Sequence, residues 1–216
     1  MRIPIAKEGY PFILIFFLIT LILLLLPQTR LGWGFWISVV ITGFIVLFFR
    51  DPERVIPPGE NVIVSPADGK IILIQEVKYP ALGDETYRQV SIFMSVFNVH
   101  VNRAPLAGTV ENVMYNPGKF FVASLNKASL LNEQNSIIFS RTMNGKPVRI
   151  LVIQIAGLIA RRMVCYAKPG VNYAKGERFG LIRFGSRVDL FLPQQTTLAV
   201  KLNDHVKGGA TIIGTL

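Results

Sequence analysis

The chain has 216 residues, of which 51% are hydrophobic, and its mean hydropathy is +0.45. It carries 23 Lys and Arg against 13 Asp and Glu, a formal net charge of +10 at pH 7. One cysteine excludes a disulfide within the chain and a metal site built from several cysteines. A basic chain can bind nucleic acid, but no Lys/Arg cluster or aromatic-studded strand supports that partner here, so we expect none.

The first 50 residues predict a membrane anchor. Two uncharged apolar runs, 11–26 and 31–49, are separated only by PQTR. A helix needs roughly 20 apolar residues to span a bilayer, and about 17 at least, so the second run is long enough and the first is marginal. So short a linker favours a transmembrane helical hairpin. A cleaved signal peptide is the alternative, but no small-x-small cleavage site follows the first run.

Basic residues orient this hairpin. Arg2 and Lys7 precede the first run, Arg50 and Arg54 follow the second, and Arg30 alone lies in the turn. Because basic residues favour the cytoplasmic side, we expect both termini there, with the anchor in the cell (inner) membrane. A basic domain held at a membrane also suggests anionic lipid headgroups as partners.

Residues 51–216 predict a mainly β domain. After the Pro-rich DPERVIPPGEN come nine short runs rich in β-branched or alternating apolar residues, each bounded by Gly, Pro, Asn or Asp. Segment 118–135 lacks strict alternation and predicts a helix or a long loop. SPADGKI (65–71) and APLAGTV (104–110) form a weak repeat 39 residues apart. Short strands joined by such Gly turns favour a barrel-sandwich hybrid, the architecture of biotinyl and lipoyl domains.

Few side chains are candidates for catalysis. His205 lies in a predicted solvated turn, whereas His100 is either a core histidine or a general base. Asp68 either closes an Asx-turn or orients a histidine, and Ser186, after Gly185, is a candidate nucleophile. The chain has no GxGxxG, Walker loop or GxSxG, and its two isolated histidines have no metal-ligand spacing, so we expect neither nucleotide nor metal.

Together these segments resemble the phosphatidylserine decarboxylase family in its short, membrane-anchored form, and the related archaetidylserine decarboxylases equally. The order and spacing of the matching blocks are more specific than any single block. The blocks are DPERVIPPGENVIVSPADGKI, FMSVFNVHVNRAPLAGTVENVMYNPGKF, NEQN and GERFGLIRFGSRVDLFLP.

This resemblance implies a proenzyme that cuts itself between Gly185 and Ser186. The products would be residues 1–185 (β chain) and 186–216 (α chain), held together as a heterodimer. Ser186 would become a pyruvoyl group, which forms a Schiff base with the amine of phosphatidylserine. Loss of CO2 would then yield phosphatidylethanolamine, with the pyruvoyl group as electron sink and no other cofactor.

The chain departs from the family pattern at two places. FGSR stands where many members carry LGST, and Arg103 stands where many carry the second of two histidines three residues apart. A guanidinium stays protonated and is a poor base. The base for self-cleavage is therefore left open between His100 acting in both steps and Asp68 acting directly.

Substrate recognition rests on basic residues. Guanidinium groups match phosphate and carboxylate, so arginines near the site are candidates, with solvated surface residues as the alternative. The candidates are Arg103, Arg161, Arg162, Arg183 and Arg187. Lys119, Phe120 and Phe121 either approach the bilayer or, for the two aromatics, pack in the core. Two rival functions stay open: a non-enzymatic, membrane-anchored lipoyl-like adaptor, and a serine hydrolase that uses Ser186 without cleavage.

Overall fold

The chain forms two compact units in a computed structural model, Met1–Glu53 and Arg54–Leu216. Each unit is described by itself. The described residues are 3–119, 132–143, 145–157, 163–183 and 185–216.

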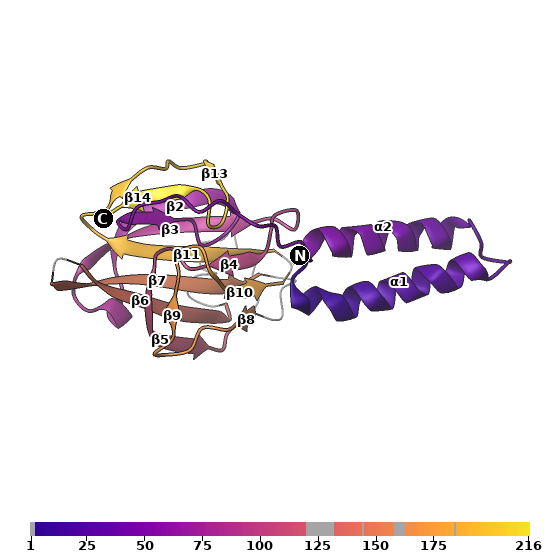
Figure 1. Cartoon of the computed structure of the whole chain (residues 1–216), viewed down its shortest axis with the longest axis horizontal. Coiled ribbons are helices and arrows are strands. Elements are labelled where there is room, and N and C mark those ends of the chain that lie inside the picture. The colour runs from indigo at the N-terminus through magenta and orange to yellow at the C-terminus, as the bar shows by residue number, and fades with distance from the viewer. Residues whose placement is uncertain (1–2, 120–131, 144, 158–162, 184) are drawn as a thin grey trace. The chain divides into compact units, whose positions relative to one another are not determined.

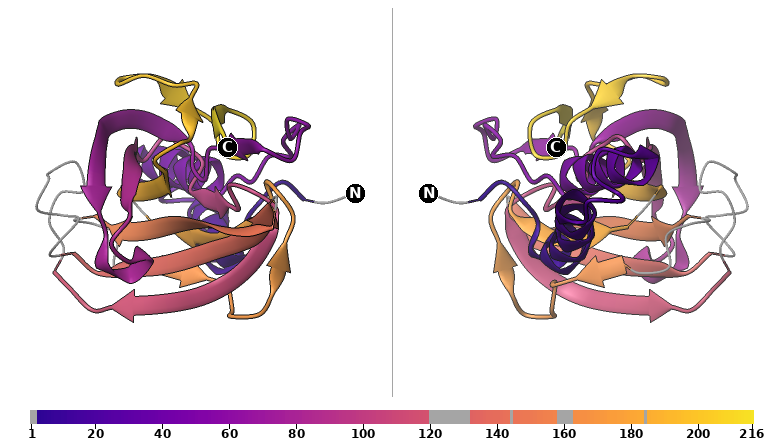
Figure 2. Two further views of the ribbon diagram at one scale, coloured as in Figure 1. Left: turned by 90° about the vertical axis from the view of Figure 1, so that its left-hand side faces the viewer. Right: turned by 90° about the vertical axis from the view of Figure 1, so that its right-hand side faces the viewer.

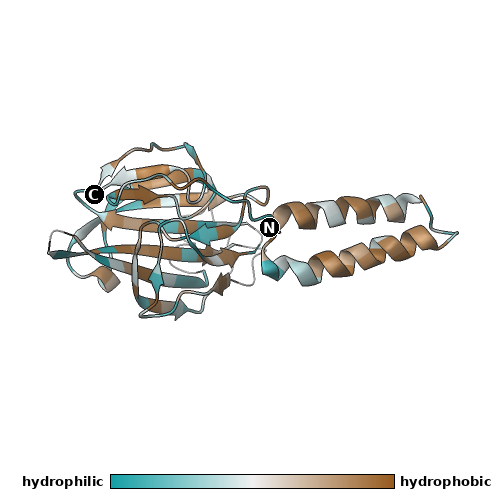
Figure 3. Ribbon diagram, viewed as in Figure 1, coloured by the Kyte–Doolittle hydropathy of each residue, from teal (hydrophilic) through white to brown (hydrophobic). Residues whose placement is uncertain are grey.

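The N-terminal unit is a pair of contacting helices (Figure 1). A 3-10 turn, η1 (Lys7–Gly9), leads into α1 (Tyr10–Leu25), and α2 (Trp33–Phe48) returns after a short turn. The hydroxyls of Thr20 and Thr42 are 3.0 Å apart across the helix pair. At its open end, the Ala6 N–H donates to the Phe49 carbonyl at 2.8 Å. Hydrophobic residues run along both helices (Figure 3).

The lengths of the two helices reverse the sequence-based ranking. The helical stretch Lys7–Leu25 has 19 residues, is long and apolar enough to cross a membrane, and has a mean hydropathy of 2.3. The second apolar run was predicted to be long enough to span a bilayer. Its helix, α2, begins only at Trp33 and has 16 residues, so it is the shorter of the two helical stretches. The η1 turn supplies the extra length of the first helix. A helical pair is thus present, and one of its two helices meets the length for a span.

The second unit is built from strands, which confirms the mainly β prediction. An eight-stranded antiparallel sheet has the order β13-β2-β3-β11-β7-β6-β5-β9 and curls into a half-barrel (Figure 2). Two three-stranded sheets, β1-β14-β12 and β4-β10-β8, complete the unit. The strands are β1 (Val62–Val64), β2 (Gly69–Lys78), β3 (Thr86–Met94), β4 (Val101–Arg103), β5 (Gly108–Asn116), β6 (Gln134–Met143), β7 (Lys146–Ala156), β8 (Met163–Cys165), β9 (Asn172–Tyr173), β10 (Arg178–Ile182), β11 (Ser186–Pro193), β12 (Thr197–Leu198), β13 (His205–Val206) and β14 (Ile212–Thr215); a 3-10 turn, η2 (Pro80–Leu82), follows β2.

The main hydrophobic core lies where the large sheet packs against the two small ones. Ile63 and Phe179 of the small sheets join Ile92, Val152 and Val188 of the large sheet in one buried cluster. A second cluster, which includes Leu151, Ile153 and Phe191, covers the other face of the large sheet. The eight residues of β11 are all buried, since this central strand is covered on both faces.

The weak sequence repeat is a true structural repeat. The Val64 N–H donates to the Pro105 carbonyl and the Arg103 N–H to the Pro66 carbonyl, both at 2.9 Å, so the two copies bond reciprocally. The pairs β2–β3 and β5–β6 also share a register shift 39 residues apart, after Ile71 and after Val110. The unit is therefore two related halves around an approximate two-fold axis.

Several short strands were missing from the sequence prediction: β4, β8, β9, β10 and β13. They have two to five residues, too few for alternation to show. His205, predicted to lie in a solvated turn, is exposed as predicted but belongs to β13 and pairs with Lys70. Gln134 and Asn135, at the end of the predicted helix or loop 118–135, begin β6 instead. Residues 120–131 of that segment lie outside the described residues.

Candidate active site

Ser186 begins the central strand of the large sheet. It pairs with Met94 of β3 on one side and Ala156 of β7 on the other, and it is fully buried. Gly185 just before it has φ +62°, the left-handed region that favours glycine. Among the described residues other than its chain neighbours, no atom lies within 4 Å of where its Cβ would be. The Gly185–Ser186 peptide therefore turns sharply out of a rigid strand, with space beside the glycine.

The Ser186 hydroxyl faces the main core. It donates to the Met94 sulfur at 3.3 Å, and the Asn102 amide nitrogen of β4 contacts the same sulfur at 3.9 Å. A thioether is a weak acceptor, so the hydroxyl is not committed to a strong hydrogen bond. Period-two alternation sends the next side chain, Arg187, to the opposite face of the sheet.

A buried row of amides fixes the orientation of Asn102. Gln154 Nε2 donates to Asn102 Oδ1 at 2.8 Å, and Asn135 Nδ2 donates to Gln154 Oε1 at 3.4 Å. With its oxygen occupied by Gln154, Asn102 turns its NH2 group toward the Met94 sulfur, which also accepts the Ser186 hydroxyl. Gly180 allows this close packing, because a Cβ there would lie 2.8 Å from Gln154 Nε2.

His100 lies two residues before Asn102, in the extended segment that enters β4, and is fully buried. Its carbonyl accepts the Ile182 N–H of β10 at 3.3 Å. Its Nδ1 lies 2.9 Å from the Asn98 carbonyl, which can only accept, so Nδ1 carries the proton and Nε2 of the neutral ring has the lone pair. Asn98 is held by the N–H and hydroxyl of Ser95, both at 2.9 Å from its Oδ1.

Asp68 and Arg103 gather at the Gly208–Gly209 turn. Asp68 Oδ2 pairs with Arg54 Nη2 at 2.8 Å, and its Oδ1 accepts the Gly208 N–H at 2.7 Å. Arg103 is buried and donates from Nη1 to the Gly176 carbonyl at 3.0 Å. The Arg103 N–H bonds the carbonyl of Pro66, so the loop that carries Asp68 is joined to the strand that follows His100.

Cys165 of β8 pairs with Gly180, whose partner on the other side is Asn102. Burial raises the pKa of its thiol, so it stays protonated at neutral pH and is a poor nucleophile. Within the part of the chain that the structure describes, no group of three or more His, Cys, Asp or Glu side chains is placed to hold a metal ion.

The sequence matches known proteins over nearly its whole length. Residues 41–214 match the family model for phosphatidylserine decarboxylase. The chain belongs to the phosphatidylserine decarboxylase family. Phosphatidylserine decarboxylase proenzymes of Citrifermentans bemidjiense and Geotalea uraniireducens are 48% and 46% identical to it, and each alignment covers 99% of this chain and 97% of the relative. That of Magnetococcus marinus is 46% identical over 98% of this chain and 95% of the relative.

In this phosphatidylserine decarboxylase family member, Ser186 begins β11 and bonds Met94, and His100 precedes β4 and bonds β10. Asp68 and Arg103 border the Gly208–Gly209 turn. Arg183 is half-buried just after β10. Arg161, Arg162, Phe120 and Phe121 lie outside the described residues. The roles assigned to all of these residues stay predictions.

The sequence did not point to Met94, Asn102 or Gln154, nor to the Arg54–Asp68 ion pair. Apolar and amide residues inside strands look like ordinary core positions, and only the pairing of four different strands brings them to Ser186. Asn102 did carry one signal. It follows His100 in VHVN at the alternation that places both side chains on one face of a strand.

Proposed function

We propose that the chain is a self-processing decarboxylase that converts phosphatidylserine to phosphatidylethanolamine and CO2. One observation carries this proposal: a buried serine, whose hydroxyl donates to a weak sulfur acceptor, directly follows a left-handed glycine at the start of a central strand. Family membership supports the same activity.

Self-cleavage uses Ser186 as an internal nucleophile. Its oxygen attacks the Gly185 carbonyl carbon while His100 takes the hydroxyl proton, which then passes to the departing peptide nitrogen. The resulting ester breaks when the Ser186 Cα proton is removed and the C–O bond opens, leaving a carboxylate on Gly185. Water then replaces the nitrogen at position 186, ammonia departs, and residues 1–185 and 186–216 stay paired through β11.

The position of Ser186 fits the pyruvoyl group proposed to form there, because β3 and β7 hold this residue from both sides. When formed, that group supplies a ketone that binds the substrate amine and accepts the electrons released as CO2 leaves. The buried surroundings exclude water from the reacting carbon, and buried His100 is the residue proposed to move the protons.

Asn102 is the proposed donor for the negative oxygen that forms during attack. Its NH2 group contacts the Met94 sulfur that accepts the Ser186 hydroxyl, and donors fixed in advance stabilise such oxygens most. We expect the double variant Asn102→Leu/Gln154→Met to cleave itself about 100-fold more slowly than the single variant Gln154→Met. The time course of the two cleaved chains measures this. Equal rates would remove Asn102 from the mechanism.

Asp68 is proposed to act through its charge. It borders the same turn as Arg103, which together with Arg183 is proposed to meet the anionic headgroup. Asp68→Asn retains the oxygen that accepts the Gly208 N–H but leaves Arg54 without its carboxylate, so we expect about a tenfold or larger loss of activity. Asp204→Asn is the matched control, because Asp204 also closes a turn, by accepting the Lys201 N–H at 2.8 Å. Equal activity in the two variants would reduce Asp68 to a turn residue.

The helical pair is proposed to anchor the chain in the inner membrane with the β unit on the cytoplasmic face. Arg2, Lys7, Arg50 and Arg54 flank the helices at the two ends that lie outside the turn. Protease added to right-side-out vesicles should leave the β unit intact, whereas protease added to inverted vesicles should remove it.

The deciding experiment is the intact mass of the purified protein under denaturing conditions. Two chains that divide between Gly185 and Ser186, the smaller about 17 Da lighter than a serine-terminated fragment, support the proposal. A single chain of 24.1 kDa contradicts it for that preparation. Release of CO2 from ester- and ether-linked serine lipids then separates phosphatidylserine from archaetidylserine as substrate.

A further inference from the structure

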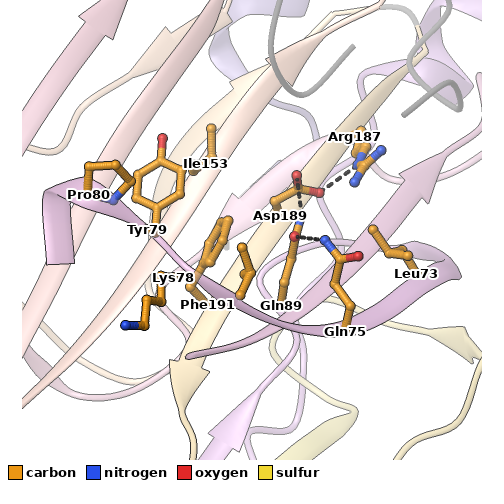
Figure 4. A pocket seen from close by; sticks show the side chains of 11 residues that line it. Leu73, Gln75, Lys78, Tyr79, Pro80, Gln89, Ile153, Arg187, Asp189 and Phe191 are labelled. Carbon is orange, nitrogen blue, oxygen red and sulfur yellow. Dashed lines mark hydrogen bonds and ion pairs between the residues drawn. The ribbon is translucent and has the colours of Figure 1, made fainter. Parts of the chain in front are cut away.

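A pocket of about 360 Å³ lies on the face of the large sheet opposite the Ser186 hydroxyl (Figure 4). It is lined by β2, β3, β7, β11 and the start of η2. Its volume is within the range of ligand pockets, about 300–1,000 Å³. Arg187 lies at one end and Tyr79 and Pro80 at the other.

The guanidinium of Arg187 has one nitrogen without a partner. Its Nε pairs with Asp189 at 2.6 Å and its Nη2 donates to Ser91 at 2.7 Å. Nη1 is buried and has no hydrogen-bond partner in the part of the chain that is described, and the residue is only 1% exposed. A buried donor without a hydrogen bond is costly, so a ligand acceptor at Nη1 would be favoured.

The charge around Arg187 is already balanced. Asp189 is 1% exposed, and its other oxygen accepts Gln89 Nε2 at 2.9 Å, while Gln75 Nε2 donates to Gln89 at 2.8 Å. An added carboxylate would place an uncompensated negative charge beside a buried ion pair, which is costly. The acceptor that fits Nη1 is therefore an uncharged oxygen.

Apart from Lys78, the rest of the pocket lining is mostly apolar. The rings of Tyr79 and Phe191 pack with centroids 4.8 Å apart, and Val77, Ile153 and Leu73 line the walls. A hydrocarbon chain matches this lining, and a carbonyl oxygen at its end matches Nη1.

We propose that this pocket binds an ester-linked acyl chain, with the ester carbonyl accepting a hydrogen bond from Arg187 Nη1. This inference stands apart from the decarboxylase proposal, because the Ser186 hydroxyl and Arg187 lie on opposite faces of β11. The sequence analysis expected Arg187 to bind a phosphate or a carboxylate. The proposal instead assigns it the carbonyl oxygen of an ester.

The test uses the full chain in phosphatidylcholine nanodiscs and a medium-chain fatty acid methyl ester that carries a photoreactive diazirine. After illumination, mass spectrometry of peptides locates the cross-links. We expect labels on the peptides that contain Val77 and Phe191. Val77→Trp fills the pocket from a half-buried strand position and should lower that labelling about tenfold. The matched change Val148→Trp, on a half-buried strand valine outside the pocket, should leave it unchanged.

Arg187→Lys tests the carbonyl contact, because lysine retains the charge beside Asp189 but lacks the planar fork. It should lower labelling by the ester without changing the circular dichroism spectrum. Competition with short-chain phosphatidylcholine would identify a phospholipid chain as the source, and competition by simple monoesters alone would identify a free ester.

Three results would overturn the inference. The first is labelling confined to α1 and α2, and the second is equal labelling in the Val77 and Val148 variants. The third is stronger competition by the free fatty acid anion than by its methyl ester, which would contradict the uncharged acceptor.

Discussion

Ser186→Ala should leave the chain uncut and without decarboxylase activity. Alanine fits the space of the serine between Met94 and Ala156 but has no oxygen to attack the Gly185 carbonyl. The ester cannot form, so the amide between residues 185 and 186 persists and no ketone appears. Intact mass should show one chain of about the full 24.1 kDa, and labelled phosphatidylserine should release no CO2.

Ser186→Thr is the informative companion to that variant. Threonine retains a hydroxyl, but its extra methyl enters a fully buried position beside the Met94 sulfur. Overpacking of this kind costs about 1–3 kcal/mol, so we expect slow but measurable cleavage. Cleavage of the alanine variant at the same bond would show that a group other than Ser186 cuts the chain, and would contradict the mechanism.

The strands of the large sheet were predictable because they are long. β2, β3, β6 and β7 each have nine to eleven residues, enough for β-branched residues and bounding turns to show. The two- and three-residue strands β4 and β13 were not, because pairing with distant segments defines them. The β13–β2 pair, for example, joins residues about 135 positions apart along the sequence.

The sequence predicted which residues are candidates for the site better than it predicted how they are arranged. Ser186, His100 and Asp68 were chosen from residue type and family resemblance, but no spacing in the sequence places them relative to one another. The structure gives His100 an orienting partner on its own loop, the Asn98 carbonyl, and gives Asp68 the partners Arg54 and Gly208. Orientation of His100 by Asp68 stays a prediction.

The internal repeat shows why pattern alone cannot locate the site. With the repeat offset of 39 residues, Ala107 is the equivalent of Asp68 and Asn61 is the equivalent of His100. The two halves therefore share a backbone arrangement but not their functional side chains. The fold needs Gly69 and Gly108 equally. A Cβ at Gly108 would lie 2.6 Å from a backbone carbonyl of the next strand, and one at Gly69 would lie closer still. The glycines of the repeat are therefore explained by close packing in the sheet, whereas the residues that differ between the two halves are the candidates for function.

His100→Gly is expected to slow self-cleavage at least 100-fold, because the site loses the base that accepts the Ser186 proton. The substitution also removes a buried ring, so slow cleavage alone would not separate chemistry from packing. It leaves a cavity of imidazole shape, bordered by the Asn98 carbonyl that held Nδ1.

Added imidazole should therefore restore cleavage of His100→Gly in a concentration-dependent way, measured as the appearance of the 186–216 chain. A matched cavity elsewhere in the same core, Phe179→Ala, should cleave without any response to imidazole, since Phe179 is equally buried but bears no base. A His100→Gly variant that folds, as shown by its circular dichroism, and gains nothing from imidazole would place the cleavage base elsewhere. Asp68 would then be the remaining candidate, because Arg103 is a guanidinium that donates to the Gly176 carbonyl and has no lone pair to offer.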